Sequence, residues 1–412
     1  MKKVLAILLV LLLSVSLFAC NSSDDSNTSP TQGTSTNAPT DSPTDSQLAV
    51  DLAPAAGMET FPEHGPVGWF TDDVDWFARE PYKIAYLTDF DSATSSLFSD
   101  GLENWSRRLN FEYQSYNANY DADAFINTMG VLAQQGYTGM ILNPDMSYFD
   151  RMKQAAEEYG ITWLPGFFPM LDDFGNPMTA QGSLGIKYQA DLLIYWLRDN
   201  YKTYLGDIDE SKIGLISTTL SNFPVLRMVS EFCVSDFKEL FPLAAGNAYE
   251  AGVDNFGVDA NSGYDVIAPI VAAHPEVEYW FNVGSLEDVV QGGVRAIDAA
   301  GLGSKSIAIS TGANLLQSAW QSGADTGSYK AGVYYSMEIF AEPLICGVIA
   351  MLDGRATLET LWPEWKDPAQ PYPVVTTACA VLTVDNYAAY NDYVDAYLTA
   401  VANKQTPPTW NP

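Results

Sequence analysis

The alternation of short apolar runs with longer amphipathic runs constrains the fold of this chain more than any other feature. In the first half of the body, strands are predicted at Lys83–Leu87, Phe111–Tyr116, Gly139–Leu142 and Ile161–Pro165. Helices are predicted at Leu97–Leu109, Ala122–Gln135 and Phe149–Tyr159. Strands that alternate with helices of about ten or more residues form parallel sheets that helices cover on both faces.

The same alternation starts again after a loop rich in Gly, Asp and Pro at residues 168–185. Helices are predicted there at Leu184–Tyr204, Pro224–Leu240, Gly263–His274 and Leu286–Ala300. Strands are predicted at Lys212–Ser217, Tyr279–Val283 and Ser306–Ser310. Two units of similar length favour an α/β protein with two doubly wound parallel-sheet lobes.

The first twenty residues are typical of a secretory signal peptide. Two lysines near the start precede an almost unbroken apolar run over residues 4–18. That run is shorter than the roughly 20 residues that a membrane-spanning helix needs. Its ending Leu17-Phe18-Ala19-Cys20 resembles the lipobox of bacterial lipoproteins, although Phe18 is bulkier than usual. The resemblance implies removal of residues 1–19 and lipidation of Cys20; an ordinary signal peptide with a chance cysteine is the alternative.

The segment that follows is predicted to be a disordered tether over residues 20–46. From Asn21 to Ser46 it consists almost entirely of Ser, Thr, Asn, Asp, Pro, Gly and Gln, with no apolar residue larger than Ala38. Such a composition cannot bury enough surface to offset the entropy of ordering. Its reach as a flexible coil is roughly 30 Å, enough to hold a globular body clear of the lipid headgroups.

The charge balance excludes one class of partner. The chain has 51 acidic and 20 basic residues, which gives a formal net charge of -31. A field of that sign repels phosphate backbones and anionic lipid surfaces, so we expect no nucleic-acid binding. The membrane contact that we expect is through the lipid anchor alone.

Motifs that carry catalysis or metal binding are scarce. The histidines are His64 and His274, and the sequence contains no H-E-x-x-H, G-x-S-x-G or G-x-x-x-x-G-K-[ST] motif. Asn and Asp alternate at residues 117–123 like calcium ligands, but the glycine and closing glutamate of an EF-hand are missing. We therefore expect no catalytic residue, metal or cofactor. Cys233, Cys346 and Cys379 are interpreted as buried free thiols, and a Cys346–Cys379 disulfide is left open.

Four phrases in the chain occur in the same order as in a known family. They are Lys83–Leu87, Leu132–Pro144, His274–Phe281 and Ala296–Gly301. In them, and in its leader, the chain resembles the type I periplasmic sugar-binding proteins that supply ABC importers, over about residues 83–397. The resemblance implies two lobes joined by a multi-strand hinge, which close on a ligand, and an ABC permease as partner. We expect the protein to be a monomer.

The domain boundaries follow from these patterns. They predict a signal peptide at 1–19, a lipid-anchored tether at 20–46 and an N-terminal extension of unknown role at 47–80. The N-terminal lobe is assigned to 81–180 with about 311–352. The C-terminal lobe is assigned to 181–310 with about 353–412.

Candidate ligand-binding residues follow the predicted strands. In open α/β sheets, ligands bind beyond the carboxyl ends of the strands, and two facing lobes would line one cleft with those ends. The candidates in the N-terminal lobe are Asp89, Phe90, Asp91, Asn143, Asp145, Phe167 and Phe168. Those in the rest of the body are Asn222, Arg227, Asn282, Glu287, Tyr335 and Glu338.

These residue types suit a sugar, whose hydroxyls bond to carboxylates and amides while its apolar face stacks on aromatic rings. Arg227 lies near the position where the family has a sugar-contacting arginine, but the Gly-Phe pair expected after it is absent. The family's aspartate after Ser306–Ser310 is also absent, since Thr311-Gly312-Ala313-Asn314 stands there. The identity of the sugar therefore stays open.

Other functions are compatible with the sequence. The protein could be a sensor that presents the same ligand to a kinase or chemoreceptor. It could be a secreted carbohydrate-active enzyme, although no motif supports one. The same fold could also bind a nucleoside, an amino acid or a signalling molecule. The sequence names neither the ligand nor the permease.

Overall fold

The computed structural model describes residues 77–89, 93–172, 175–221, 223–377 and 379–403, together with 405, 408 and 410. The chain divides into two compact units, 1–42 and 43–412, and every described residue belongs to the second. The expected signal peptide, Cys20, the tether and most of the 47–80 extension lie outside the described residues.

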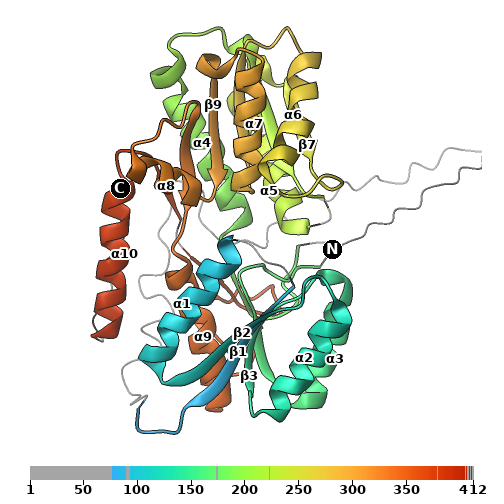
Figure 1. Cartoon of the computed structure of the whole chain (residues 1–412), viewed down its shortest axis with the longest axis vertical. Coiled ribbons are helices and arrows are strands. Elements are labelled where there is room, and N and C mark those ends of the chain that lie inside the picture. The colour runs from blue at the N-terminus through green and yellow to red at the C-terminus, as the bar shows by residue number, and fades with distance from the viewer. Residues whose placement is uncertain are drawn as a thin grey trace, which may run out of the picture. The chain divides into compact units, whose positions relative to one another are not determined.

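Four parallel strands form the first sheet, in the order β2-β1-β3-β4 (Figure 1). The strands are β1 (Tyr82–Thr88), β2 (Phe111–Asn117), β3 (Gly139–Asn143) and β4 (Thr162–Pro165). Thr88 at the end of β1 is level with Asn117 of β2 and Asn143 of β3. The carboxyl ends of these strands therefore lie along one edge of the sheet.

Helices cover both faces of this sheet, and β1, β3 and β4 are buried along most of their length, whereas the edge strand β2 is largely exposed. The helices are α1 (Ala93–Leu109), α2 (Ala122–Gln134), α3 (Phe149–Tyr159) and α9 (Met337–Leu352). Helix α1 packs beside α9, and α2 packs beside α3. Ile84 and Tyr86 of β1 belong to the same apolar cluster as Phe98 of α1, whereas Leu87 belongs to the cluster of Phe125 in α2. This alternation along β1 is that of a strand buried on both faces.

The second sheet has six strands in the order β12-β10-β9-β8-β6-β7, all parallel except β12. The strands are β6 (Ile213–Thr219), β7 (Ala248–Gly252), β8 (Tyr279–Gly284), β9 (Ser306–Thr311), β10 (Tyr329–Tyr334) and β12 (Ala380–Leu382). The helices are α4 (Ile186–Leu205), α5 (Pro224–Leu240), α6 (Ala260–Ala273), α7 (Glu287–Ala299), α8 (Asn314–Ser322) and α10 (Tyr387–Ala402). Helices α4 and α5 pack together, as do α6 and α7 (Figure 1).

The chain passes between the two sheets three times. A two-stranded parallel sheet of β5 (Gln181–Ser183) and β11 (Val374–Thr376) accompanies two of these passages. The remaining passage, which is the second in chain order, lies between β10 in the second sheet and α9 on the first sheet. Two doubly wound parallel sheets joined in this way confirm the predicted fold class.

The structure differs from the expected division at residues 311–352. Strand β10 lies in that segment but pairs with β9 in the second sheet, because α8 returns the chain to the edge beside β9. Only α9, after β10, packs on the first sheet. Strand β11, inside the 353–412 segment, pairs with β5, which was assigned to the same lobe, but the two strands form a sheet of their own.

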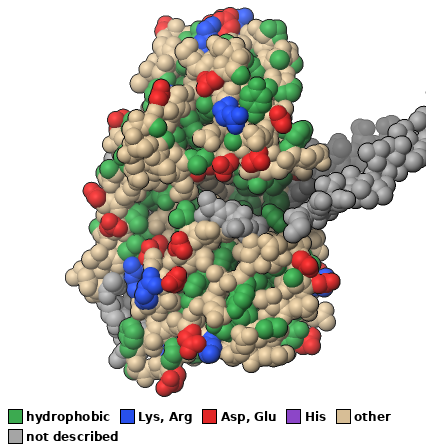
Figure 2. Space-filling model, viewed as in Figure 1, with side chains coloured by type: hydrophobic (Ala, Val, Ile, Leu, Met, Phe, Trp, Pro, Cys, Tyr) green, Lys and Arg blue, Asp and Glu red, His purple; other side chains and the backbone are tan. Residues whose placement is uncertain are grey.

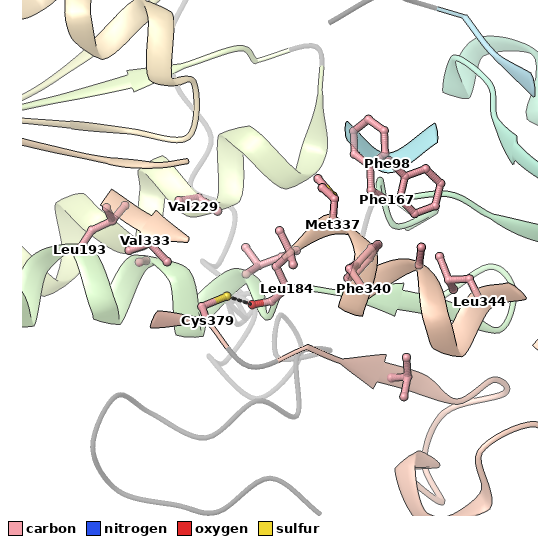
Figure 3. Packing of buried hydrophobic residues seen from close by; sticks show 14 of the residues in the cluster. Phe98, Phe167, Leu184, Leu193, Val229, Val333, Met337, Phe340, Leu344 and Cys379 are labelled. Carbon is pink, nitrogen blue, oxygen red and sulfur yellow. Dashed lines mark hydrogen bonds between the residues drawn. The ribbon is translucent and has the colours of Figure 1, made fainter. Parts of the chain in front are cut away.

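One buried apolar cluster extends from the first sheet to the second (Figure 3). Phe98 and Phe167 come from the first sheet's elements, Val229 and Val333 from the second's, and α9 lies among them. The thiol of Cys379 lies 3.8 Å from the carbonyl oxygen of Leu184.

The three cysteines of the described body are free and buried, so the expectation of free thiols is confirmed. The alternative Cys346–Cys379 disulfide is wrong. Cys346 lies inside α9, whereas Cys379 follows β11 and lies beside Leu184.

Candidate functional site

Asp89, directly after β1, links three loops at the carboxyl edge of the first sheet. Its N–H donates to the carbonyl of Asn143 (3.1 Å), and its carbonyl accepts from the N–H of Tyr120 (2.7 Å). Its Oδ2 accepts from the N–H of Asp145 (2.7 Å) and from the hydroxyl of Tyr148. Burial raises the pKa of Asp89, and these hydrogen bonds oppose the rise. The other oxygen, Oδ1, is buried without a partner, so Asp89 has an unused acceptor.

Asn143 ends β3, and Asp145 follows it after Pro144. The amide of Asn143 donates to the hydroxyl of Tyr86 (3.1 Å), and its Oδ1 is a second buried acceptor without a partner. Asp145 accepts from the N–H of Ser147 (2.8 Å) and so caps the short helix η3 (Met146–Tyr148). Asp89, Asn143 and Asp145 are thus brought together at one edge, as the strand order predicts.

Tyr120, in the loop after β2, is a residue that the sequence analysis missed. Its side chain is 69 % exposed, and Asn119 and Tyr120 both adopt positive φ, 53° and 60°. Such angles are uncommon for residues other than glycine and mark a constrained turn. Partial burial and the negative charges of Asp89 and Asp145 raise the pKa of Tyr120. The alternating Asn and Asp of residues 117–123 indicate a loop after the second strand, but no residue type there distinguishes Tyr120.

Phe167 and Phe168 follow β4 and differ in environment. Phe167 is 4 % exposed and packs against Phe98 with ring centroids 5.5 Å apart, which makes it a core residue. Phe168 is half-buried and lies 6.2 Å from the ring of Phe223, at the start of α5. Phe168 therefore touches elements of both sheets, and of the two it is better placed to offer a ring to a ligand.

Unpartnered hydroxyls mark the carboxyl edge of the second sheet. Thr219 ends β6, Ser285 follows β8 and Thr311 ends β9, and the side-chain oxygen of each is buried without a hydrogen-bond partner. Buried polar atoms are normally paired with protein or water, so each unpaired one calls for an explanation. The sequence analysis missed all three, because serine and threonine are too common to stand out.

Glu287 begins α7 and is engaged by the protein itself. Its carboxylate accepts from the N–H groups of Asn314 (3.1 Å) and Leu315 (2.7 Å), in the first turn of α8. Burial raises its pKa to about 7, although these hydrogen bonds lower it. Its position next to the end of β9 agrees with the expected site, but its oxygens act as a cap for α8.

Asn282 and Glu338 are placed differently from the expectation. Asn282 lies within β8, fully buried, and its amide donates to the carbonyl of Val290 under α7 (2.9 Å). Glu338 forms an ion pair with Arg108 of α1 and accepts from Asn104 (3.2 Å). Both hold helices in place, and neither lies free at a strand end.

The remaining candidates are only partly described. Arg227 lies in the first turn of α5, half-exposed, with a guanidinium nitrogen 3.7 Å from Glu231. Tyr335 follows β10, half-buried, with its ring 6.2 Å from that of Phe340. Phe90, Asp91 and Asn222 lie outside the described residues.

The described part of the chain has neither a cluster of metal ligands nor a membrane-spanning helix. No group of three or more His, Cys, Asp or Glu side chains in the described part of the chain is arranged to hold a metal ion. None of the helices in that part has the length and apolar character needed to cross a membrane.

Known proteins resemble this chain in structure and not in sequence. No protein-family model matches the chain, and no curated protein sequence matches it. Among solved structures, LsrB from Clostridium saccharobutylicum in complex with AI-2 aligns with a TM-score of 0.57 and 15 % identity, covering 75 % of this chain and 99 % of that one.

Two other solved structures give the same result. A 5-methylthioribose transporter solute-binding protein from Thermotoga lettingae, with bound 5-methylthioribose, has a TM-score of 0.57 and 14 % identity, covering 78 % of this chain and 99 % of that one. An ABC transporter periplasmic solute-binding protein from Actinobacillus succinogenes, with bound D-allose, has a TM-score of 0.57 and 13 % identity, covering 76 % of this chain and 100 % of that one. This chain therefore has the fold of the type I periplasmic sugar-binding proteins of ABC transporters.

Proposed function

We propose that this protein is an extracytoplasmic solute-binding lipoprotein that captures a small polar ligand and delivers it to an ABC permease. The ligand class that fits best is a mono- or oligosaccharide. Binding is proposed to close the two lobes, and the closed shape is what the permease recognises. We propose a binding role rather than catalysis, with no cofactor, and a monomer as the working unit.

One observation carries this proposal: buried polar atoms without partners collect at the carboxyl ends of strands in both sheets. They are Asp89 Oδ1, Asn143 Oδ1, Thr219 Oγ1, Ser285 Oγ and Thr311 Oγ1. Unpaired buried polar groups are costly, and a hydroxyl-rich ligand would supply both donors and acceptors to them. The carboxyl edges are also where open α/β sheets bind ligands.

The ligands of the structural neighbours support a sugar. Their bound molecules include 5-methylthioribose, D-allose and L-arabinofuranose. Micromolar binding of such a ligand needs only about -8 kcal/mol, within reach of a few charge-assisted hydrogen bonds and one stacked ring. Asp89, Asn143, Asp145, Phe168 and Thr311 are the residues that we propose for these contacts.

Thr311→Val should weaken ligand binding without affecting the fold, because valine keeps the shape of the side chain and removes only an unpartnered hydroxyl. Loss of a hydrogen bond of about 1–2 kcal/mol corresponds to roughly 5- to 30-fold weaker binding. A thermal-shift screen with ribose, allose, arabinose and galactose would identify the ligand, and titration calorimetry would compare the variant with the wild type.

Ser328→Ala is the matched control for this experiment. Ser328 also has a buried hydroxyl without a partner, but it precedes β10, at the amino end of the strand. Equal loss of affinity in both variants, or none in Thr311→Val, would contradict the placement of the ligand at the carboxyl ends. Absence of any sugar-dependent shift in the wild type would contradict the proposed ligand class.

The proposed lipid anchor has its own test. Cys20→Ala should move the protein from the membrane fraction to the soluble extracytoplasmic fraction, since the cysteine thiol is the only acylation site of a lipobox. Cell fractionation followed by immunoblotting measures this, with Cys233→Ala as a control for loss of any cysteine. Unchanged membrane association of Cys20→Ala would contradict the anchor.

A further inference from the structure

The carboxyl edge of the first sheet carries negative charge without a counter-charge. The charges that act on Asp89 are those of Asp145 and Asp121, both negative. Within the described ranges, no lysine or arginine forms an ion pair with any of these three aspartates. A buried carboxylate without a cation is costly. A ligand that brings a positive charge would remove that cost.

Two arginines on neighbouring helices are paired with other acidic side chains. Arg151 on α3 lies 2.6 Å from Asp123, and Arg227 on α5 lies 3.7 Å from Glu231. The space-filling view shows a hollow between the upper and lower parts of the molecule, and acidic side chains lie above and below it (Figure 2). The surroundings of Asp89 therefore repel anions.

Two of the helix N-termini at this edge could attract an anion, but aspartates already occupy them. Asp121 accepts from the N–H groups of Asp123 (3.0 Å) and Ala124 (2.9 Å) at the start of α2. Asp145 caps η3 in the same way. These donors, which would otherwise bind a phosphate or carboxylate, are already used. The starts of α2 and η3 are thus closed to an anionic ligand.

The loop that carries Tyr120 lies beside Asp89. The backbone N–H of Tyr120 donates to the carbonyl of Asp89 (2.7 Å), and the side chain of Tyr120 is exposed at this edge. A tyrosine ring attracts a cation through its face, and carboxylates attract it by charge. The unpartnered Oδ1 of Asp89, a side chain that is only 1 % exposed, is the acceptor that such a group would complete.

We propose that the ligand carries a protonated amine, bound by Asp89, Asp145 and Tyr120, so that its class is that of the amino sugars. The proposal rests on the proposed function, since it names the chemistry of the ligand in that site. Hydroxyls of the same ligand are left for Asn143 and for the second sheet.

Two series of sugars that differ mainly in charge test whether the mature protein prefers a positively charged ligand. Each series consists of a neutral sugar, its 2-amino derivative and its uronic acid, with glucose and galactose as parents, and calorimetry gives the three dissociation constants. The amine should bind tightest and the acid weakest in one series at least. Asp89→Asn should weaken binding of the amine by about 10- to 100-fold, because a charge-assisted hydrogen bond is lost. Binding of the neutral sugar should weaken much less.

Two further variants separate this effect from a folding defect. Tyr120→Asn removes the ring at an exposed position, and asparagine tolerates positive φ, so the variant should fold and lose part of the preference for the amine. Asp209→Asn makes the same charge change at the cap of η4 (Glu210–Lys212), before β6, and should leave all three constants unchanged.

The outcomes distinguish the two proposals. Neutral sugars that bind as tightly as their amines, or a preference that survives Asp89→Asn, would overturn this inference and leave the proposed function standing. An acid that binds tightest would overturn it as well. If no member of either series binds the wild type but a sugar of the thermal-shift screen does, this inference fails and the proposed function stands. If none of these sugars binds, both fail together.

Discussion

Replacing Glu342 with glutamine should raise the melting temperature at pH 8 by roughly 5–15 °C, with little effect at pH 4. Glu342 lies inside α9, 1 % exposed, where one oxygen accepts from the hydroxyl of Tyr397 (3.1 Å) and the other has no partner. Burial raises its pKa to about 8, against the lowering effects of Tyr397 and Arg108. Glutamine imitates the protonated acid and never acquires the charge.

The direction of this change in stability with pH follows from how the folded and unfolded states bind the proton of Glu342. The folded protein keeps the proton of Glu342 up to about pH 8, whereas the unfolded chain releases it near its ordinary pKa of about 4.3. Stability is therefore lost as the pH rises between these values, by roughly 4–5 kcal/mol in all. For a body of this size, each kcal/mol corresponds to roughly 2–4 °C.

Thermal unfolding from pH 4 to 9 measures the effect. The wild type should lose stability as the pH approaches 8, and the difference between variant and wild type should grow over the same range. Glu158→Gln, an exposed change on α3, controls for the altered net charge. Parallel curves for the Glu342 variant and the wild type would show that Glu342 is not buried as an acid.

Gly292→Ala should destabilise the protein by about 3 kcal/mol, although alanine is normally the better helix former. Helices α6 and α7 approach so closely that a Cβ at Gly292 would collide with the carbonyl of Ala260, and a Cβ at Gly263 would collide with that of Val289. Overpacking against backbone cannot be relieved by a rotamer change, so the helices must separate. Chemical denaturation measures the loss.

Gly246→Ala is the matched control for the helix pair. A Cβ at this exposed position meets nothing within 4 Å, so we expect a change of less than about 0.5 kcal/mol. Gly263→Ala should resemble Gly292→Ala, because it widens the same contact from the other helix. A neutral result for both would mean that α6 and α7 are not in close contact.

The strands and helices of the body could largely be predicted, because doubly wound sheets bury continuous apolar strands and amphipathic helices. Helices α8, α9 and α10 were not predicted. Helix α9 is apolar almost all round and has no periodic face. Strands β5, β11 and β12 have three residues each, too few to give a pattern, and β7 is a half-exposed edge strand.

The site could be predicted to the level of strand ends and no further. Asp89 and Asn143 lie where the topology puts them, because parallel strands end at a common edge. The direction of a side chain depends on partners that are distant in the sequence. Glu338, for example, forms an ion pair with Arg108. Tyr120 was not predicted because its exposure follows from positive φ at two successive residues, Asn119 and Tyr120, and their residue types do not predict that conformation.

The position of α9 also determines the order in which the molecule can fold. Helix α9 packs on β3 and β4, where Val348 approaches Gly139 and Leu164 approaches Gly347, yet it follows all of β6–β10 in the chain. During synthesis, the first sheet and α1 emerge early, but the apolar face of β3 and β4 has no cover from α9 until nearly the whole protein has been made. Such non-local closure slows folding. A chain that stays incompletely folded until late in its synthesis would still be able to pass through an export channel.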